Sequence, residues 1–247
     1  MPAHPDNAQS KDVVREHVWA LLENENAAPL GVRGSIPAFH GAELAADRLA
    51  QHPAWDAANV VKAVPDKAQH PVRARALREG KLVYMAVPKL AEPEPFYFLD
   101  PARITVSPED AATSKVAHQI ARTLDVSDMR PVDLVVCGSV AVNRDGVRIG
   151  KGAGYSDIEV AILCEAGLIG PQTTIVTTVH SLQVVDGPLP ETEHDFGVDV
   201  IVTPEEIIEC PRRDRSYRII WEHLTPSKVE KIPLLRKRWQ ERSSTSC

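Results

Sequence analysis

Aromatic residues and paired cysteines are scarce in this sequence, and long apolar runs are missing from it. Phe, Trp and Tyr make up 5% of the 247 residues, so an aromatic platform for stacking nucleic-acid bases is not expected. The four cysteines, at positions 137, 164, 210 and 247, form no C-x-x-C pair, which argues against a zinc site and a disulfide framework. No apolar run approaches the roughly 20 residues of a membrane span, and the polar N-terminus has no signal-peptide core. These absences favour a globular protein of the reducing cytoplasm.

The net charge of −6 is divided unevenly along the chain. A basic C-terminal extension from about residue 210 contains ten Lys/Arg and four Asp/Glu, a net of +6, and the remainder carries 18 basic and 30 acidic residues, a net of −12. A basic tail is able to contact nucleic acid, so salt-dependent RNA binding by residues 210–247 is one hypothesis. The alternative is a solvated C-terminal helix that packs on an acidic body. We prefer this alternative, and nucleic acid is then not the expected partner.

Helix and strand patterns alternate along most of the chain. Residues 1–10 are expected to be disordered, and Ser10 is suited to cap a helix from Lys11 to about Asn24. Apolar strands are predicted at 59–64, 81–88, 133–142, 173–179, 198–204 and 216–224, and further helices at 42–51, 71–80, 111–124, 157–168 and 227–239. Continuous apolar strands separated by helices indicate one α/β domain, residues 11–247, with a largely parallel sheet covered on both faces.

Four glycines crowd into "GVRIGKGAGYSD", residues 146–157. The stretch follows a predicted hairpin at "NRDG" (143–146) and precedes a helix. Unpaired N–H groups near a helix N-terminus bind phosphate, glycines let the backbone approach an anion, and Lys151 adds a positive charge. The spacing matches neither G-x-x-x-x-G-K-[ST] nor G-x-G-x-x-G. The stretch is equally well interpreted as a glycine-rich turn in which Ser156 caps the helix and Asp157 lies in its first turn.

Other charged residues offer weaker signals of a ligand site. Lys11 and Arg15 share a helix face, and two cations in the first turns oppose the helix dipole. An anionic ligand would relieve this conflict, as would the acidic neighbours of an ordinary solvated face. The carboxylates of "ETEHD" (191–195), with Asp195 last, suit Mg²⁺ beside a phosphate site, although acidic loops are usually just solvated. His180 is either a polar residue at a strand end or a substrate contact.

Taken together, these stretches resemble the 5-formyltetrahydrofolate cyclo-ligases, also called methenyltetrahydrofolate synthetases. "DLVVCGSVAVNRDGVRIGKGAGYSD" is similar to their glycine-rich signature, and "VHSLQVVDGPLPETEHDFGVDVIVTP" to their second block. The Lys-x3-Arg of the first helix matches as well, so the resemblance spans about residues 11–205. Residues 18–50 and 60–90 resemble a divergent branch, the methenyltetrahydrofolate synthetase domain-containing proteins. Ser156 stands where the family has a second tyrosine, and "PDKAQHPVRARAL" where cyclo-ligases usually have a Glu and a Thr that meet the folate.

The resemblance implies a three-layer, Rossmann-like α/β fold and an ATP- and Mg²⁺-dependent ligase of one-carbon metabolism. In that chemistry ATP phosphorylates the formyl oxygen of 5-formyltetrahydrofolate. N10 then attacks the activated carbon, which yields 5,10-methenyltetrahydrofolate, ADP and phosphate. By matching position, Asp157 and Asp195 would hold Mg²⁺, directly or through water, and Lys151 and Tyr155 are the catalytic candidates. Tyr155 would also line the pterin pocket. The ATP-binding candidates are Lys11, Arg15, Arg148, Gly150, Lys151, Gly152, Ala153, Gly154 and Tyr155.

The expected partner is a small molecule, a folate derivative under this resemblance. We expect a cytoplasmic monomer or small homo-oligomer. Because the folate-facing residues depart from the family pattern, the alternative is an ATP-binding relative that acts on a small molecule other than folate, for example one of thiamin metabolism.

Overall fold

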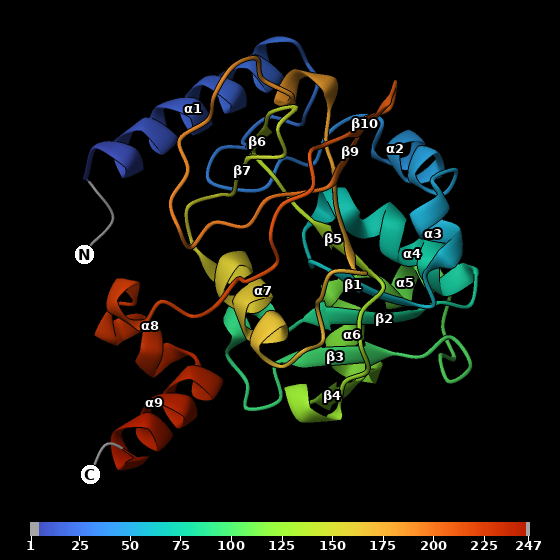
Figure 1. The fold of residues 1–247 in the computed structure, drawn as a ribbon. Helices are drawn as coiled ribbons and strands as arrows, with labels where there is room; N and C mark the ends of the chain where they lie inside the picture. The colour runs from blue at the N-terminus through green and yellow to red at the C-terminus, as the bar shows by residue number, and fades with distance from the viewer. Residues whose placement is uncertain (1–4, 246–247) are drawn as a thin grey trace.

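A computed structural model describes residues 5–245, which form a three-layer α/β fold around a mixed sheet (Figure 1). The eight strands have the order β10-β9-β8-β5-β1-β2-β3-β4. The run from β9 to β2 is parallel, while β10, β3 and β4 pair antiparallel at the edges. The strands are β1 (Val60–Ala63), β2 (Leu82–Ala86), β3 (Phe96–Leu99), β4 (Arg122–Leu124), β5 (Leu134–Cys137), β8 (Thr174–Thr178), β9 (Val200–Val202) and β10 (Ile207–Glu209). The mostly parallel α/β sheet predicted from the sequence is confirmed.

The central strands are buried on both faces, as their apolar sequences predict. All four residues of β1 and of β5 are buried. Val61 of β1 lies in register between Leu134 of β5 and Val83 of β2. Because successive side chains point to opposite faces of a sheet, each strand contributes to a core on either side. Lys62 is a charged exception within β1, with 0% of its surface exposed.

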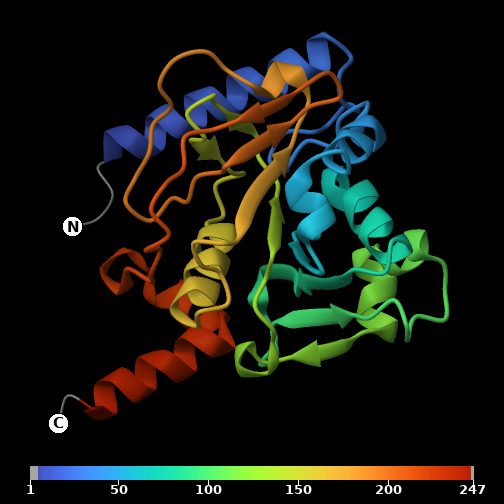
Figure 2. The same ribbon diagram turned by 45° about the vertical axis from the view of Figure 1, so that its right-hand side comes forward.

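Helices cover both faces of the sheet (Figure 2). On one face α1, α2 and α4 share a buried cluster that includes Val18, Leu49 and Val72. On the other face α7 and the start of α9 contribute Leu163 and Leu235 to a second cluster. The helices are α1 (Pro5–Asn24), α2 (Ala42–Leu49), α3 (Pro53–Ala57), α4 (His70–Arg78), α5 (Pro108–Ala111), α6 (Ser114–Ile120), α7 (Tyr155–Glu165), α8 (Pro226–Lys231) and α9 (Pro233–Thr245). Within the described chain, every helix is too short or too polar to cross a membrane.

A small antiparallel hairpin, β6 (Ala141–Val142) with β7 (Arg148–Ile149), follows β5. Its turn is closed by the Gly146 N–H, which donates to the Asn143 carbonyl oxygen at 2.9 Å. Gly146 has a φ of 78°, and a Cβ there would lie 2.3 Å from the Val198 carbonyl oxygen, so the turn requires glycine. The predicted hairpin is confirmed, and it leads the glycine stretch to the N-terminus of α7.

Two predicted helices differ from the observed ones. The first, α1, begins at Pro5 rather than Lys11, so Ser10 lies inside the helix and residues 5–10, expected to be disordered, are helical. The other residues of that expected disorder, 1–4, lie outside the described part. The helix predicted at 111–124 is instead α5, α6 and strand β4. Ser107 and Thr113 each cap a short helix by accepting a backbone N–H, and these local caps divide the segment.

The C-terminal segment also differs from its prediction. Residues 216–224, predicted as a strand, run irregularly into a 3₁₀ turn, η5 (Trp221–His223). The predicted last helix is divided into α8 and α9 at Ile232, which has the extended backbone favoured before a proline, here Pro233. The strands β3 and β10 have no counterpart in the prediction, because their apolar runs, Phe96–Leu99 and residues 207–208, are too short to mark a strand by periodicity.

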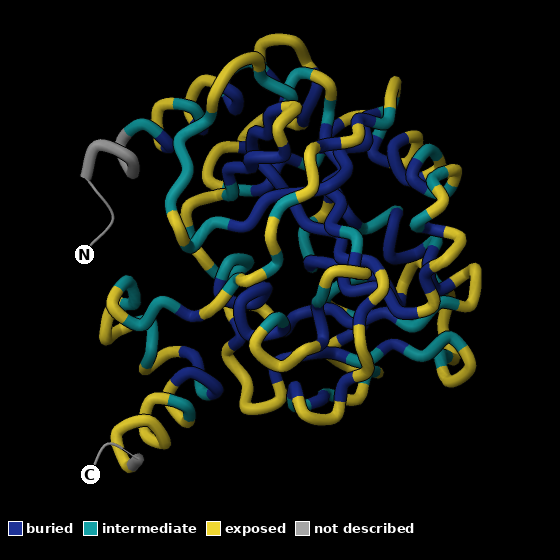
Figure 3. Tube along the Cα trace, in the orientation of Figure 1, coloured by how far each residue is buried: buried dark blue, intermediate teal, exposed yellow. Residues whose placement is uncertain are grey.

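The first part of the basic C-terminal segment packs on the body, and most of α9 is exposed (Figure 3). Ile232 and Leu235 are fully buried. Basic side chains of this segment pair with acidic groups of the body: Arg213 with Glu191, Arg215 with Asp199, and Arg238 with Glu165. This is the packing on acidic groups that we prefer from the sequence.

Candidate functional site

One cavity of about 520 Å³ is lined by all the residues predicted to bind ATP or Mg²⁺ or to act in catalysis. It lies beside the carboxyl ends of β1 and β2, where parallel sheets commonly bind ligands, with Asp66 following β1 and Lys89 following β2. Helix α1, residues 148–157 and the loop 192–195 form the other walls. The predicted residues that line it are Lys11, Arg15, Arg148, Gly150, Lys151, Gly152, Ala153, Gly154, Tyr155, Asp157 and Asp195.

The glycine segment, residues 150–154, leads directly into α7. Gly152 and Gly154 have φ angles of 93° and 69°, in the left-handed region that other residues disfavour. Gly154 is the N-cap of α7, and no side chain of the described residues caps this helix. Ser156, predicted as the cap, lies inside the first turn, because the helix starts at Tyr155. The first N–H groups of α7 therefore remain available to an anion at the positive end of the helix dipole.

Two guanidinium groups lie against the glycine segment. Arg15 Nε donates to the Gly150 carbonyl oxygen at 2.7 Å, and a Cβ on Gly152 would lie 3.4 Å from Arg15 Cζ. A Cβ on Gly150 would lie 2.8 Å from Arg148 Nη2. The absence of side chains at both glycines thus lets two cations approach the loop. Arg148 Nε is buried without a hydrogen-bond partner among the described residues, and an anionic ligand would satisfy such a donor.

Arg148 is held in place by three contacts. Its Nη1 lies 3.2 Å from Asp157 Oδ1, and its Nη2 donates to the Gly138 carbonyl oxygen at 3.2 Å. Its guanidinium also lies 4.2 Å from the centroid of the Phe196 ring, within the range of a cation–π contact. With its side chain 3% exposed, Arg148 is a fixed positive group beneath the N-terminus of α7.

The loop 192–195 brings a carboxylate to the N-terminal helix. Lys11 Nζ forms an ion pair with Asp195 Oδ2, and it also donates to Thr192 Oγ1 at 3.3 Å. The Thr192 N–H and hydroxyl each donate to Asp195 Oδ2 at 2.7 Å. Burial raises the pKa of Asp195, but the Lys11 ammonium and the Thr192 donors outweigh it and leave this pKa below its usual value. Asp195 is therefore held as a carboxylate.

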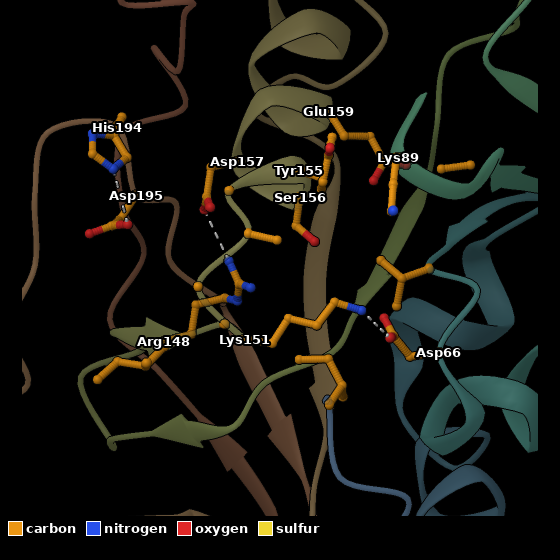
Figure 4. Close-up of a pocket in the computed structure, with 18 of the residues that line it drawn as sticks. Asp66, Lys89, Arg148, Lys151, Tyr155, Ser156, Asp157, Glu159, His194 and Asp195 are labelled. Carbon is orange, nitrogen blue, oxygen red and sulfur yellow. Dashed lines mark hydrogen bonds and ion pairs between the residues drawn. The ribbon is translucent and has the colours of Figure 1, made fainter. Parts of the chain in front are cut away.

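The two predicted metal ligands face the cavity from different elements (Figure 4). Asp157 projects from α7 and is paired with Arg148, while Asp195 is paired with Lys11. Across residues 5–245, no group of three or more His, Cys, Asp or Glu side chains is arranged to hold a metal ion. Mg²⁺ often takes only one or two carboxylates together with substrate phosphates and water. The residues thus fit a Mg²⁺ ion that arrives with a nucleotide better than a preformed metal centre.

The two predicted catalytic residues lie on the cavity wall with different partners. Lys151 reaches across from the glycine segment, and its Nζ lies 3.0 Å from Asp66 Oδ1 (Figure 4). The ammonium group of Lys228 lies 3.8 Å from the centroid of the Tyr155 ring. The Lys151 side chain is 41% exposed, and such exposed ion pairs contribute little to stability. An incoming anion would therefore compete easily with Asp66 for this lysine.

A buried ion pair in the cavity wall was not expected from the sequence. Glu159 of α7 lines the cavity, and its Oε1 lies 2.7 Å from the Nζ of Lys62 on β1, with the two side chains 4% and 0% exposed. Neither of these two atoms has a well-oriented hydrogen bond to any described residue. Burial raises the pKa of Glu159, although the Lys62 ammonium opposes the shift. A lysine inside "NVVKAV" and a glutamate inside "DIEVAIL" are the sequence signals that point to this pair.

Histidines join the loop 192–195 to the C-terminal segment. His194 Nδ1 lies 3.3 Å from His223 Nδ1, and His223 Nε2 lies 3.2 Å from Glu193 Oε1. His194 also lines the main cavity. Glu193 is thus paired within the protein, and the sequence offers no motif that predicts the contact between the two histidines.

His180 is a structural residue at the end of β8. Its Nδ1 accepts the Leu182 N–H at 3.1 Å and so caps the 3₁₀ turn η4 (Ser181–Gln183). Burial lowers the pKa of His180, which favours the neutral ring that this acceptor role requires. Of the two interpretations of His180, the geometry supports the polar strand-end residue.

Comparison with known proteins identifies the family of the chain. A sequence model of the 5-formyltetrahydrofolate cyclo-ligase family matches residues 7–204. The chain belongs to this family. Methenyltetrahydrofolate synthase domain-containing proteins of Homo sapiens and Danio rerio are 35% and 36% identical to it, over 92% and 94% of this chain and 61% and 62% of theirs. The chain therefore spans about three fifths of the length of these curated relatives.

A solved structure confirms the fold expected of a cyclo-ligase-like enzyme. The NMR structure of 5,10-methenyltetrahydrofolate synthetase from Aquifex aeolicus aligns with a TM-score of 0.53 at 22% identity, over 87% of this chain and 99% of that one. At this identity the likeness concerns the fold. The family match ends at residue 204, so η5, α8 and α9 lie beyond it.

Proposed function

We propose that the protein uses ATP and Mg²⁺ to convert 5-formyltetrahydrofolate into 5,10-methenyltetrahydrofolate. The observation that supports this most is the convergence of Lys11, Arg15 and Arg148 with the uncapped N-terminus of α7 in one cavity. Cations and backbone donors in this arrangement stabilise the charge on a transferring phosphoryl group. Membership of the cyclo-ligase family supports the same reaction.

In this proposal the glycine segment, Arg15, Lys151 and the two aspartates have separate tasks. ATP would supply a phosphoryl group to the formyl oxygen, so that N10 displaces phosphate as the ring closes. The glycine segment and Arg15 bind phosphate oxygens, and Lys151 leaves Asp66 to follow the transferred group. Asp157 and Asp195 would hold Mg²⁺ beside the phosphates, directly or through water. The three cysteines in the described part of the chain are free thiols, and we expect a cytoplasmic monomer or small homo-oligomer with a small-molecule substrate.

A direct assay tests the reaction. The purified protein is mixed with 5-formyltetrahydrofolate, ATP and Mg²⁺, and the absorbance of methenyltetrahydrofolate is followed over time. We expect turnover that requires both ATP and Mg²⁺, and omission of either is the control. A protein that binds ATP yet shows no turnover above background would rule out the folate reaction.

A second candidate is an ATP-dependent enzyme that uses the same nucleotide site but a small molecule other than folate. The observation that supports it is the Lys62–Glu159 pair, which adds a buried carboxylate to the cavity wall. Ser156 also offers a hydroxyl where the family resemblance has an aromatic ring. Both features place polar groups on the wall of the cavity that a substrate would contact.

A ligand-stabilisation screen separates the two candidates. A ligand that binds the native state raises the melting temperature by mass action. The screen compares 5-formyltetrahydrofolate with other nitrogen heterocycles, including thiamin precursors, in the presence of ATP. A strong shift with 5-formyltetrahydrofolate and none with the others would eliminate the second candidate.

A further inference from the structure

The segment beyond the family match covers the start of α7. Residues of η5 and α8 lie beside the N-terminal turn of α7, and together they line a second cavity of about 150 Å³. Gly154, Asp157 and His194 line both this cavity and the main one. The C-terminal segment is thus a direct neighbour of the predicted phosphate site, although it lies outside the matched residues 7–204.

Lys228 contacts two residues of the predicted phosphate site. Its Nζ donates to the Ala153 carbonyl oxygen at 2.7 Å, and it lies 3.8 Å from the centroid of the Tyr155 ring. Its backbone is fixed as well, because Thr225 caps α8 by accepting the Lys228 N–H at 3.2 Å. The ammonium is therefore held against the glycine segment by a helix that is itself capped.

The contact with Ala153 fixes the direction of one peptide group. In a trans peptide the C=O and the following N–H point in opposite directions. The Ala153 carbonyl faces Lys228, so the Gly154 N–H faces away from it. Within the described part of the chain, no acceptor takes this N–H. It therefore adds to the unpaired donors at the start of α7, as an anion site requires.

The Ala153–Gly154 peptide needs a contact from outside the glycine segment to fix its orientation, because the residues on either side of Ala153 are glycines. Gly152 and Gly154 flank Ala153, and both have positive φ angles. Glycine adopts positive and negative φ with similar ease, so the segment has little intrinsic preference for the observed orientation. A rotated Ala153–Gly154 peptide would present a carbonyl oxygen where a donor now lies, and that oxygen would repel phosphate.

We infer that Lys228 is a positioning residue of the nucleotide site: it holds the Ala153–Gly154 peptide with its N–H available to a phosphate group and keeps the Tyr155 ring against the same wall. The segment after residue 204 therefore completes the phosphate cradle of this protein. The inference rests on the proposed function only in assuming that the glycine segment binds the phosphates of ATP.

The test compares ATP binding by full-length variants, measured by isothermal titration calorimetry with and without Mg²⁺. We expect Lys228→Met to weaken ATP binding about ten-fold, the scale of one lost hydrogen bond. Lys228→Arg keeps a cationic donor for the Ala153 carbonyl and the Tyr155 ring, and it should restore most of the affinity. Lys231→Met removes an exposed lysine from the same helix and serves as the matched control, with wild-type affinity expected.

The outcomes separate this inference from the proposed function. If the wild type binds ATP and Lys228→Met binds it as tightly as Lys231→Met, the role of Lys228 is overturned. If the wild type does not bind ATP, the proposed function fails first. Melting temperatures show whether each variant folds. If Lys228→Met does not fold, the ATP affinities of Lys228→Gln and Lys228→Arg are compared instead. Equal affinities overturn the inference, and weaker ATP binding by Lys228→Gln supports it.

Discussion

The two sides of the cavity present charge in different ways. Around residues 148–157 and the loop 192–195, cations and backbone donors face the cavity, and Arg148 Nε has no hydrogen-bond partner among the described residues. Beside β1 and β2 the cavity wall contains a buried ion pair, Lys62 with Glu159, and apolar residues such as Val64 and Val87, in addition to Asp66 and Lys89. An anion would stabilise the unpaired donor on the first side, whereas Lys62 and Glu159 already neutralise each other. The comparison teaches that unpaired donors and a self-neutralising ion pair occupy separate parts of the same cavity wall.

The largest expected effect lies at the buried pair. Lys62→Met leaves Glu159 buried without its cation, and breaking such a pair costs about 3–5 kcal/mol of unfolding free energy. The double variant Lys62→Met/Glu159→Met removes both charges and should recover most of this loss. Urea unfolding measures both. If Lys62→Met is as stable as the wild type, the Lys62–Glu159 ion pair does not stabilise the wall of the cavity beside β1 and β2.

The same double variant also tests whether the two sides of the cavity act separately. Its ATP affinity should stay within about two-fold of the wild type, because the phosphate side keeps its cations and donors. Calorimetry with ATP measures this affinity. A large loss of ATP binding would show that the two sides do not act separately.

The next effect concerns the phosphate side. Arg15→Met removes a cationic donor that also contacts the Gly150 carbonyl oxygen, and ATP affinity should fall about 10- to 100-fold, the scale of hydrogen bonds to charged groups. Calorimetry with ATP measures the loss. Arg33→Met, at an exposed arginine paired with Glu16, is the matched control. Unchanged ATP affinity in Arg15→Met would remove Arg15 from the phosphate site.

A smaller effect is expected from Asp157→Asn. The amide keeps the shape of the side chain, so the fold should persist, while Mg²⁺ loses a charged ligand. We expect the Mg²⁺ concentration for half-maximal ATP-dependent activity to rise about ten-fold. A Mg²⁺ titration of the activity measures the shift, with Asp56→Asn on the exposed surface of α3 as control. Wild-type Mg²⁺ dependence would remove Asp157 from the metal role.

The smallest effect is expected from Gly152→Ala. A left-handed φ costs a residue with a Cβ about 1–2 kcal/mol, which corresponds to a melting temperature lowered by a few degrees in a domain of this size. The new Cβ would also lie 3.4 Å from Arg15 Cζ, and ATP binding should weaken by a few-fold. Gly170→Ala is the control, since no atom lies within 4 Å of its Cβ position. Equal melting temperatures for the two variants would contradict the expected strain.

The fold could be predicted from the sequence where local pattern decides it. The strands β1 and β8 fall within the predicted ranges 59–64 and 173–179, because continuous apolar runs mark strands buried on both faces. The strands β3 and β10 could not be predicted in this way, since their apolar runs, Phe96–Leu99 and residues 207–208, are too short to mark a strand by periodicity. The single helix predicted at 111–124 was wrong, because the caps Ser107 and Thr113 start two short helices there. Hydrophobic periodicity alone does not detect such caps.

The residues of the candidate site also differ in whether the sequence alone could identify them. Arg148 to Asp157 could be named because they lie in one short motif, and they do line the cavity together. Their roles toward ATP and Mg²⁺ stay predictions. Glu159 was missed although a charge inside an apolar run marks it, because its partner Lys62 is far away in the chain. Lys228 has no such mark, and its contact with Ala153 arises only in the fold.

The sequence by itself determined that a glycine segment lies between a hairpin and a helix, where an anion cradle and a side-chain-capped turn were both open. This follows from local physics, because glycine permits left-handed φ angles and a helix N-terminus leaves N–H groups unpaired. Only the tertiary structure decided which side chains surround those donors. Lys11 meets Asp195, Arg15 meets Gly150 and Lys228 meets Ala153 across separations of 184, 135 and 75 residues. Packing of the sheet and helices sets such contacts, and no local pattern encodes them.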